Sequence, residues 1–230
     1  MSGMNMTSSV DNTAASIERN NLHTEELFVE FYSDRDWNKY RPLLSEIIRY
    51  APPGKILDVG CGLGFFIECA RQFNFDAEGV EGSPYAVEQC RSRGLPVHEQ
   101  LLSERLPYED ETFAVVVVNQ VIEHIPNDVA KILLREALRV LKPSGIVIIK
   151  SPSKYNLAER KEKTHINMYA TSQLLKDVTQ AGFIMVNRTN AYRDFGLGHA
   201  GRLFASLLRR FIPSDYVYIT ANCIARKPER

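Results

Sequence analysis

Three glycines and two acidic residues are spaced in this sequence as a nucleotide-binding turn requires. Gly60, Gly62 and Gly64 directly follow a short apolar run that contains Asp58. Residues without a Cβ let the backbone turn with positive φ and bring its amides close to a ligand. Glu81 ends the next apolar run, where its carboxylate could accept hydrogen bonds from both hydroxyls of a ribose. Asp58, beside the turn, could accept hydrogen bonds from an ammonium group, directly or through water.

The glycine spacing separates two kinds of nucleotide-binding turn. Dinucleotide dehydrogenases use the pattern G-x-G-x-x-G, whereas here the third glycine comes one residue earlier and Phe65 takes the last position. A nicotinamide-dependent oxidoreductase is therefore the less favoured alternative. A third hypothesis is a non-catalytic module that binds the cofactor and serves as a partner subunit of another protein.

The Asp-x-Gly-x-Gly-x-Gly sequence at 58–64, with Glu81, resembles the first motifs of the class I S-adenosylmethionine-dependent methyltransferases. Three later segments match further motifs of that family in order and spacing, namely Leu106–Phe113, Asn119–His124 and Arg139–Gly145. The resemblance implies an α/β fold of the Rossmann-like kind, with a doubly wound, mostly parallel seven-stranded sheet whose last strand is antiparallel. It also implies S-adenosyl-L-methionine as the cofactor.

The resemblance further implies roles for the residues around the turn. It assigns methionine recognition to Asp58, and the adenine-contacting position, usually an Asp, falls on Leu102. Adenine would then be held by backbone groups near Leu102 and Ser103 and by apolar packing. Asn119 is the better candidate for the methionine end, because the carboxyl end of a central strand borders the ligand crevice. The expected cofactor-binding residues are Asp58, Gly60, Cys61, Gly62, Gly64, Glu81, Gly82, Leu102, Ser103, Asn119 and Gln120.

Two histidines could act as general base for an acceptor hydroxyl. His124 ends the Asn119–His124 motif, and His165 lies in a polar stretch after the fifth apolar run. A base contributes on the order of a hundred- to ten-thousand-fold when the acceptor must lose a proton, whereas a neutral amine acceptor can react without one. The alternative for His124 is a structural hydrogen bond. No H-x-x-x-H or paired-cysteine spacing occurs, so the sequence predicts no metal site.

The acceptor class rests on resemblance alone. The chain is similar to stand-alone bacterial enzymes that methylate sugars, lipid-linked sugars or secondary metabolites. We therefore expect a methyltransferase acting on a small molecule, at a hydroxyl. The residues Asn-Gln-Val-Ile at 119–122 differ from the N-P-P-[YF] tetrapeptide of adenine and glutamine N-methyltransferases, which disfavours those reactions.

The candidate residues must be positioned by strands and helices. Along the chain, short apolar runs typical of strands alternate with stretches of helical periodicity. This alternation predicts a doubly wound sheet. The Val115–Val118 run is apolar on both faces, which is typical of a central parallel strand. The predicted strands are 55–59, 77–81, 97–101, 113–119, 146–149, 183–187 and 216–225, and the predicted helices between them are 65–73, 84–93, 128–141 and 172–180.

The chain is expected to hold one domain. Residues 1–22 are polar, with few large apolar groups, and predict a disordered tail. The methyltransferase domain is expected over 23–230, with N-terminal helices at 23–52 and acceptor or lid elements at 153–215. The stretch 198–212 has an apolar helical face, which indicates core packing; a lid, a dimer contact or peripheral contact with lipid are the alternatives.

Composition limits the partners. The 28 basic and 28 acidic residues cancel, so no global positive field attracts nucleic acid. The four cysteines lack C-x-x-C spacing, and no stretch of about 18 apolar residues occurs. We expect a cytoplasmic protein with reduced thiols and no transmembrane segment, which acts as a monomer or homodimer on a small-molecule acceptor.

Overall fold

The computed structural model describes residues 37–192, 197–208 and 210–229, together with residues 16, 25 and 28. Apart from these three positions, the predicted tail and the first predicted N-terminal helix lie outside the described residues. The strands are β1 (Ile56–Val59), β2 (Ala77–Glu81), β3 (Val97–Glu99), β4 (Phe113–Asn119), β5 (Leu141–Lys150), β6 (Ile184–Asn187) and β7 (Cys223–Arg226). The α-helices are α3 (Arg41–Tyr50), α4 (Phe65–Gln72), α5 (Pro84–Ser92), α6 (Asn127–Val140), α7 (Thr171–Gln180) and α8 (Gly198–Leu208), and the 3₁₀ turns are η1 (Trp37–Tyr40), η2 (Glu159–Lys161) and η3 (Ser214–Tyr216).

The seven strands form one sheet in the order β3-β2-β1-β4-β5-β7-β6. The pairs from β3 to β5 are parallel, and β7 runs antiparallel to both of its neighbours. The predicted fold class is confirmed. The carboxyl ends of β1, β2, β4 and β5 therefore share one edge of the sheet with the segment that leads into β7, and ligands of open α/β sheets bind at this edge.

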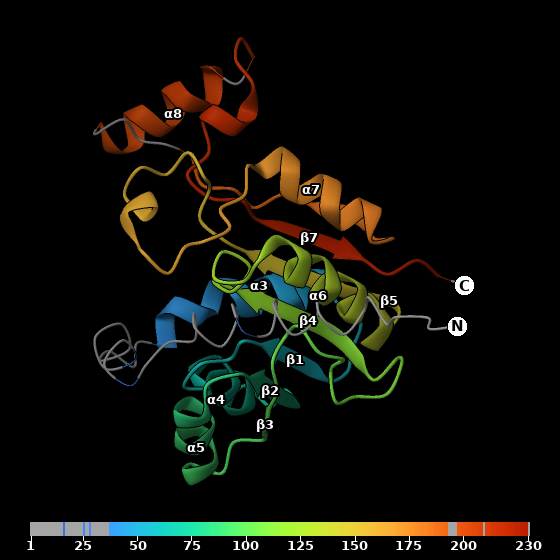
Figure 1. Ribbon diagram of the computed structural model, residues 1–230. Helices are drawn as coiled ribbons and strands as arrows, with labels where there is room; N and C mark the ends of the chain where they lie inside the picture. Colours follow the sequence, from blue (N-terminus) through green and yellow to red (C-terminus); the bar gives the residue numbers. More distant parts are fainter. Residues whose placement is uncertain are drawn as a thin grey trace, which may run out of the picture.

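Helices cover both faces of the sheet (Figure 1). Successive strand residues point to opposite faces, so Ile56 packs in one core with α3, α4 and α5, while Leu57 packs in the other with α6 and α7. Residues Phe113–Val118 of β4 are all buried, as predicted for a central strand covered on both faces.

The starts of β5 and β7 differ from the predicted ones by several residues, whereas the other strand boundaries differ by at most two. β5 starts at Leu141, directly after α6, whereas the sequence predicts a strand that starts at 146. Its pairing with β4 shifts between Phe113 and Val115, and Ser144 adopts φ 62°, so the irregular residues form a bulge within the strand. The last strand begins at Cys223 rather than at 216, because Tyr216 belongs to the 3₁₀ turn η3.

One arginine fastens the segment between β3 and β4 to α6. The guanidinium of Arg139 donates to the carbonyl oxygens of Tyr108 at 2.8 Å and Leu106 at 3.1 Å. It also pairs with Asp110 at 2.8 Å and with Glu136 at 2.6 Å. These contacts explain physically why the Arg139 motif accompanies the Leu106–Phe113 motif.

The helix α8 stands apart from the sheet in Figure 1. Among the described residues, Ala205 and Leu208 of this helix pack against Val217 and Tyr218 in a small cluster. None of the described helices is both long enough and apolar enough to cross a lipid bilayer.

Candidate functional site

The glycine turn after β1 has the backbone shape that the sequence predicts. Gly60, Gly62 and Gly64 have φ of 65°, 51° and 73°. A Cβ on Gly60 would lie 2.7 Å from a methyl group of Val121, and one on Gly64 would lie 2.8 Å from Leu95. Glycine is therefore required at these two positions for conformation and for space.

Glu81 holds this turn in place. Its Oε2 accepts a hydrogen bond from the Gly62 amide at 2.8 Å, and its Oε1 accepts one from the Ser83 amide at 2.8 Å. The sequence predicted a ribose ligand for this carboxylate but not these two backbone contacts. Each carboxylate oxygen has a further lone pair that a ribose hydroxyl could use.

Asp58 is buried at the end of β1. Burial, followed by the nearby Glu81 and Cys90, raises the pKa of this carboxyl well above its usual range. An opposite charge nearby would favour its ionised form. The role of Asp58 in binding an ammonium group stays a prediction.

Two thiols and an arginine support the turn from behind. The Cys90 thiol donates to the Gly62 carbonyl oxygen at 3.3 Å. A hydrogen bond between Cys61 and Cys90 raises the pKa of Cys61 and lowers that of Cys90. Arg93, at the end of α5, donates to the carbonyl oxygen of Leu63. All four cysteines are free thiols, as predicted.

The segment after β3 lies beside Glu81. The Gln100 amide donates to the Glu81 carbonyl oxygen at 2.9 Å, which brings Leu102 and Ser103 to the same edge as Gly82. The Leu102 side chain is buried in the core cluster that includes Val80. Its backbone, not its side chain, is therefore the part that a ligand could reach.

Asn119 and Gln120 lie at the carboxyl end of β4 and line a pocket of about 240 Å³. Lys39 and Tyr40 of η1 and Lys150 of β5 line it as well. Tyr40 also packs against Phe66, with ring centroids 5.9 Å apart. The residues before β1 thus both cover the sheet and border this pocket.

Glu123, His124 and His165 form a second group at the same edge. The ligand-capable atoms of these three side chains lie within 4.8 Å of one another, and the two imidazole rings are in edge contact. Glu123 is fully buried, and burial raises the pKa of its carboxyl to about 8. The backbone amide of Glu123 itself and the Ser151 hydroxyl lie close enough to offset part of this rise in pKa, yet neither forms a well-made hydrogen bond with the carboxylate.

The sequence predicted the two histidines separately, and only the fold brings them together. Asn167 fixes the contact, because its amide nitrogen donates to the Glu123 carbonyl oxygen at 3.0 Å and its side chain to that of Ile122 at 3.3 Å. Glu123 was not predicted as a site residue. Its only local signal is its place beside His124 in the sequence.

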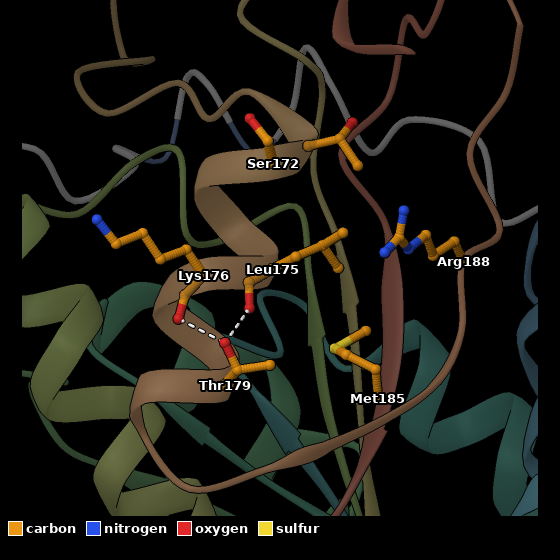
Figure 2. Close-up of a pocket in the computed structure, with 7 residues that line it drawn as sticks. Ser172, Leu175, Lys176, Thr179, Met185 and Arg188 are labelled. Atoms are coloured by element: carbon orange, nitrogen blue, oxygen red, sulfur yellow. Dashed lines mark hydrogen bonds between the residues drawn. The ribbon is translucent and has the colours of Figure 1, made fainter. Parts of the chain in front are cut away.

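A larger pocket lies between α7 and β6 (Figure 2). Its volume is about 420 Å³, and Lys176 and Arg188 border it from the helix and from the residue after the strand. In the sheet, β4, β5 and β7 lie between β6 and β1. This pocket is therefore separate from the glycine turn that follows β1. It contains none of the predicted site residues.

Comparison with known proteins agrees with this geometry. The family described as "Methyltransferase domain" matches residues 31–187. Over 169 residues the chain is 28% identical to a probable S-adenosylmethionine-dependent methyltransferase of Mycobacterium tuberculosis, covering 68% of this chain and 60% of that protein. Over 114 residues it is 34% identical to the ubiquinone biosynthesis O-methyltransferase of Pseudomonas entomophila, covering 45% and 48% of the two chains. The chain thus spans less than two thirds of the length of these relatives.

A solved structure shows the same fold. It is a SAM-dependent methyltransferase from Archaeoglobus fulgidus, with a TM-score of 0.65 and 17% identity over 89% of this chain and all of the other. The family match covers more than half of the chain, and the glycine turn and the strand order are those expected of the family. This chain belongs to the class I S-adenosylmethionine-dependent methyltransferase family, whose cofactor is S-adenosylmethionine.

Proposed function

We propose that this chain transfers a methyl group from S-adenosylmethionine to a hydroxyl group of a small molecule, namely a sugar, a lipid-linked sugar or a secondary metabolite. The observation that carries the proposal is the contact between His124 and His165 at the sheet edge that also holds the glycine turn. When bound, the cofactor supplies a methyl group activated by a positively charged sulfur. The name of the Pseudomonas relative, an O-methyltransferase, supports an oxygen acceptor.

The residues of the turn fit this cofactor. Asp58 is buried among negative neighbours, so the cationic ammonium and sulfonium groups would meet a carboxylate whose ionised form they stabilise. Gly60, Gly62 and Gly64 all have positive φ, the backbone shape that lets a glycine turn bring its amides close to a ligand. We assign the ammonium group to Asp58, the ribose to Glu81, and the adenine to the backbone of Leu102 and Ser103.

The two histidines are suited to take a proton. The Nδ1 of His124 lies 3.2 Å from the Thr164 carbonyl oxygen, and the Nδ1 of His165 lies 2.9 Å from that of Glu159. A carbonyl oxygen only accepts hydrogen bonds, so the neutral rings carry their proton on Nδ1 and a lone pair on Nε2. That lone pair is what a general base needs.

Calorimetry tests the family function first. The demethylated cofactor, S-adenosylhomocysteine, should bind to the full chain and NAD should not. If NAD binds and S-adenosylhomocysteine does not, the oxidoreductase hypothesis replaces this one. If S-adenosylhomocysteine binds but no acceptor in a broad hydroxyl and amine screen is methylated, a cofactor-binding subunit is the better description.

The histidines are tested next, with an acceptor found in that screen. We expect His165→Gln to lower turnover on the order of a hundredfold or more, with the affinity for S-adenosylhomocysteine unchanged, because a base contacts the acceptor and not the adenosine. His124→Gln should affect rate and binding together, since His124 is near the cofactor-facing Asn119 in the sequence. His98→Gln, at an exposed histidine of β3, is the control. Full activity of His165→Gln would remove this residue from the mechanism.

Within the proposed acceptor classes, the surface of α8 favours a lipid-linked molecule. The side chains of Leu203, Phe204 and Leu207 are 61%, 52% and 53% exposed, and that of Phe211 just beyond the helix is 83% exposed. Residues 197–212 include no acidic residue and several arginines. An apolar face flanked by cations is typical of a helix that lies in the surface of an anionic membrane.

We therefore propose an anionic bilayer surface as the occupant of this helix face. The full chain should co-sediment with vesicles containing phosphatidylglycerol and much less with pure phosphatidylcholine vesicles. Leu207→Glu should abolish co-sedimentation, whereas Leu157→Glu, at an equally exposed leucine outside the helix, should not. If the wild type is instead a dimer that Leu207→Glu converts to monomer without any vesicle binding, the occupant is a second copy of the chain.

A further inference from the structure

The group formed by Glu123, His124 and His165 has the composition of a metal-binding site. Its three side chains offer one carboxylate oxygen and two imidazole nitrogens, all within 4.8 Å of one another. They come from two segments, the turn after β4 and the loop after β5, which the hydrogen bonds of Asn167 hold against each other. The contact is thus part of the fold rather than a chance approach of surface side chains.

The protein stabilises the charged form of the buried Glu123 carboxyl poorly. This side chain is fully buried, and neither of its oxygens has a hydrogen-bond partner among the described residues. The neighbouring Ser151 hydroxyl is directed at the Pro152 carbonyl oxygen, 3.3 Å away. A buried carboxylate without hydrogen bonds is costly unless it is paired with a cation or coordinates a metal.

The two histidines have the arrangement of metal ligands. Metal-bound histidines almost always donate their other ring N–H to a carboxylate or to a backbone carbonyl, which fixes the tautomer and orients the ring. The Nδ1 atoms of His124 and His165 contact the carbonyl oxygens of Thr164 and Glu159 in this way. Nε2 is then the ligating atom in both rings.

We propose that Glu123, His124 and His165 bind one divalent transition-metal ion. Imidazole ligands suit Zn²⁺, Fe²⁺ and Ni²⁺ and disfavour Mg²⁺ and Ca²⁺, which prefer oxygen ligands. With bonds of about 2.1 Å, ligand atoms lie about 3 to 3.5 Å apart. The ligand atoms, which now lie up to 4.8 Å apart, must therefore move closer together when the ion binds.

Three protein ligands leave positions open on the ion, and an acceptor oxygen could occupy one of them. An alcohol oxygen bound there would have a lower pKa, so that its O–H bond breaks and the proton passes to solvent water. The histidine lone pairs would then hold the metal instead of taking the proton. This role rests on the proposed hydroxyl acceptor, whereas the metal binding itself does not.

Cobalt is a suitable probe, because its visible absorption reports nitrogen ligation. The full chain, treated with chelator and dialysed, should bind one equivalent of Co²⁺ and develop this absorption in the absence of cofactor and acceptor. Glu123→Gln and His165→Gln should each weaken Co²⁺ binding by at least about 100-fold, beyond the loss typical of residues that only orient a ligand. His199→Gln, at an exposed histidine of α8, should leave it unchanged.

Each contrary result overturns a defined part of the proposal. Failure of the wild type to bind Co²⁺ while still binding S-adenosylhomocysteine would remove the metal site and leave the general-base proposal in place. Equal Co²⁺ affinity in wild type, Glu123→Gln and His165→Gln would place the ion elsewhere. Displacement of Co²⁺ by equimolar Mg²⁺ would overturn the assignment to a transition metal. Circular dichroism of each variant checks that it is folded.

Discussion

Replacement of Glu81 by glutamine tests what gives the glycine turn its shape. Both carboxylate oxygens of Glu81 accept backbone amides, from Gly62 and from Ser83, each at 2.8 Å. A glutamine side chain has one oxygen and one NH₂ group, so one of these two amides must face a donor. The substitution keeps the size of the side chain and removes one acceptor and the charge.

The magnitude follows from the hydrogen bonds lost. A hydrogen bond to a charged group contributes about 1.5 to 3 kcal/mol, and Glu81 is only 7% exposed, so water replaces it poorly. If that free energy is lost from the ligand-binding form of the turn, the affinity for S-adenosylhomocysteine falls by roughly 10- to 150-fold, since about 1.4 kcal/mol corresponds to a factor of ten. Glu81→Ala removes both acceptors and should lose at least as much.

Isothermal calorimetry with S-adenosylhomocysteine measures this loss directly. The matched control is Glu99→Gln, because Glu99 pairs with Glu81 in the neighbouring strand but is exposed and does not contact the turn. Thermal unfolding of each variant shows whether the fold remains. A Kd for Glu81→Gln within about threefold of the wild type would refute the role of Glu81 as the anchor of the turn.

Three further predictions concern the supports of the site. Gly60→Ala should lower the free energy of unfolding, measured in urea, by about 1 to 2 kcal/mol for the left-handed backbone. The contact of the new Cβ with Val121 should cost a further amount of about 1 to 3 kcal/mol. Adding Val121→Ala to the same chain should recover only this second part. Asp58→Asn should raise the melting temperature of the ligand-free protein at neutral pH, because a carboxyl whose pKa is raised on folding loses stability as pH rises above its unfolded value. The same variant should bind S-adenosylhomocysteine more weakly, and wild-type affinity should fall as pH decreases through the raised pKa. Arg139→Met should destabilise the protein by about 2 to 4 kcal/mol, with part of the loss recovered by adding Glu136→Leu, since the unpaired carboxylate is then gone.

These predictions separate fold damage from loss of the site. An equal stability for Gly60→Ala and the wild type would contradict the strained turn. An Asp58→Asn variant that is less stable than the wild type at neutral pH would show that the carboxylate makes a favourable contact in the ligand-free protein. No gain from the second substitution beside Arg139→Met would show that the backbone contacts, not the ion pair, hold the helix to the loop.

The parts of this protein that depend on local pattern could be predicted from its residues alone. The buried run of β4 was predicted with its observed boundaries, because a strand covered on both faces must be apolar at every position. The glycine turn was predicted because positive φ at three alternate residues restricts the residue type. Both constraints act within a few residues, so the one-dimensional pattern contains them.

Features that join distant segments of the chain became visible only in the folded protein. β7 starts at Cys223, after the 3₁₀ turn η3 and where the chain reaches the neighbouring strands of the sheet. The apolar run in the sequence does not indicate this starting point. The backbone contacts of Glu81 exist only because β2 lies beside β1. Glu123 and His165 have no sequence spacing that links them, and the fold brings them together because β4 and β5 end at the same edge of a parallel sheet.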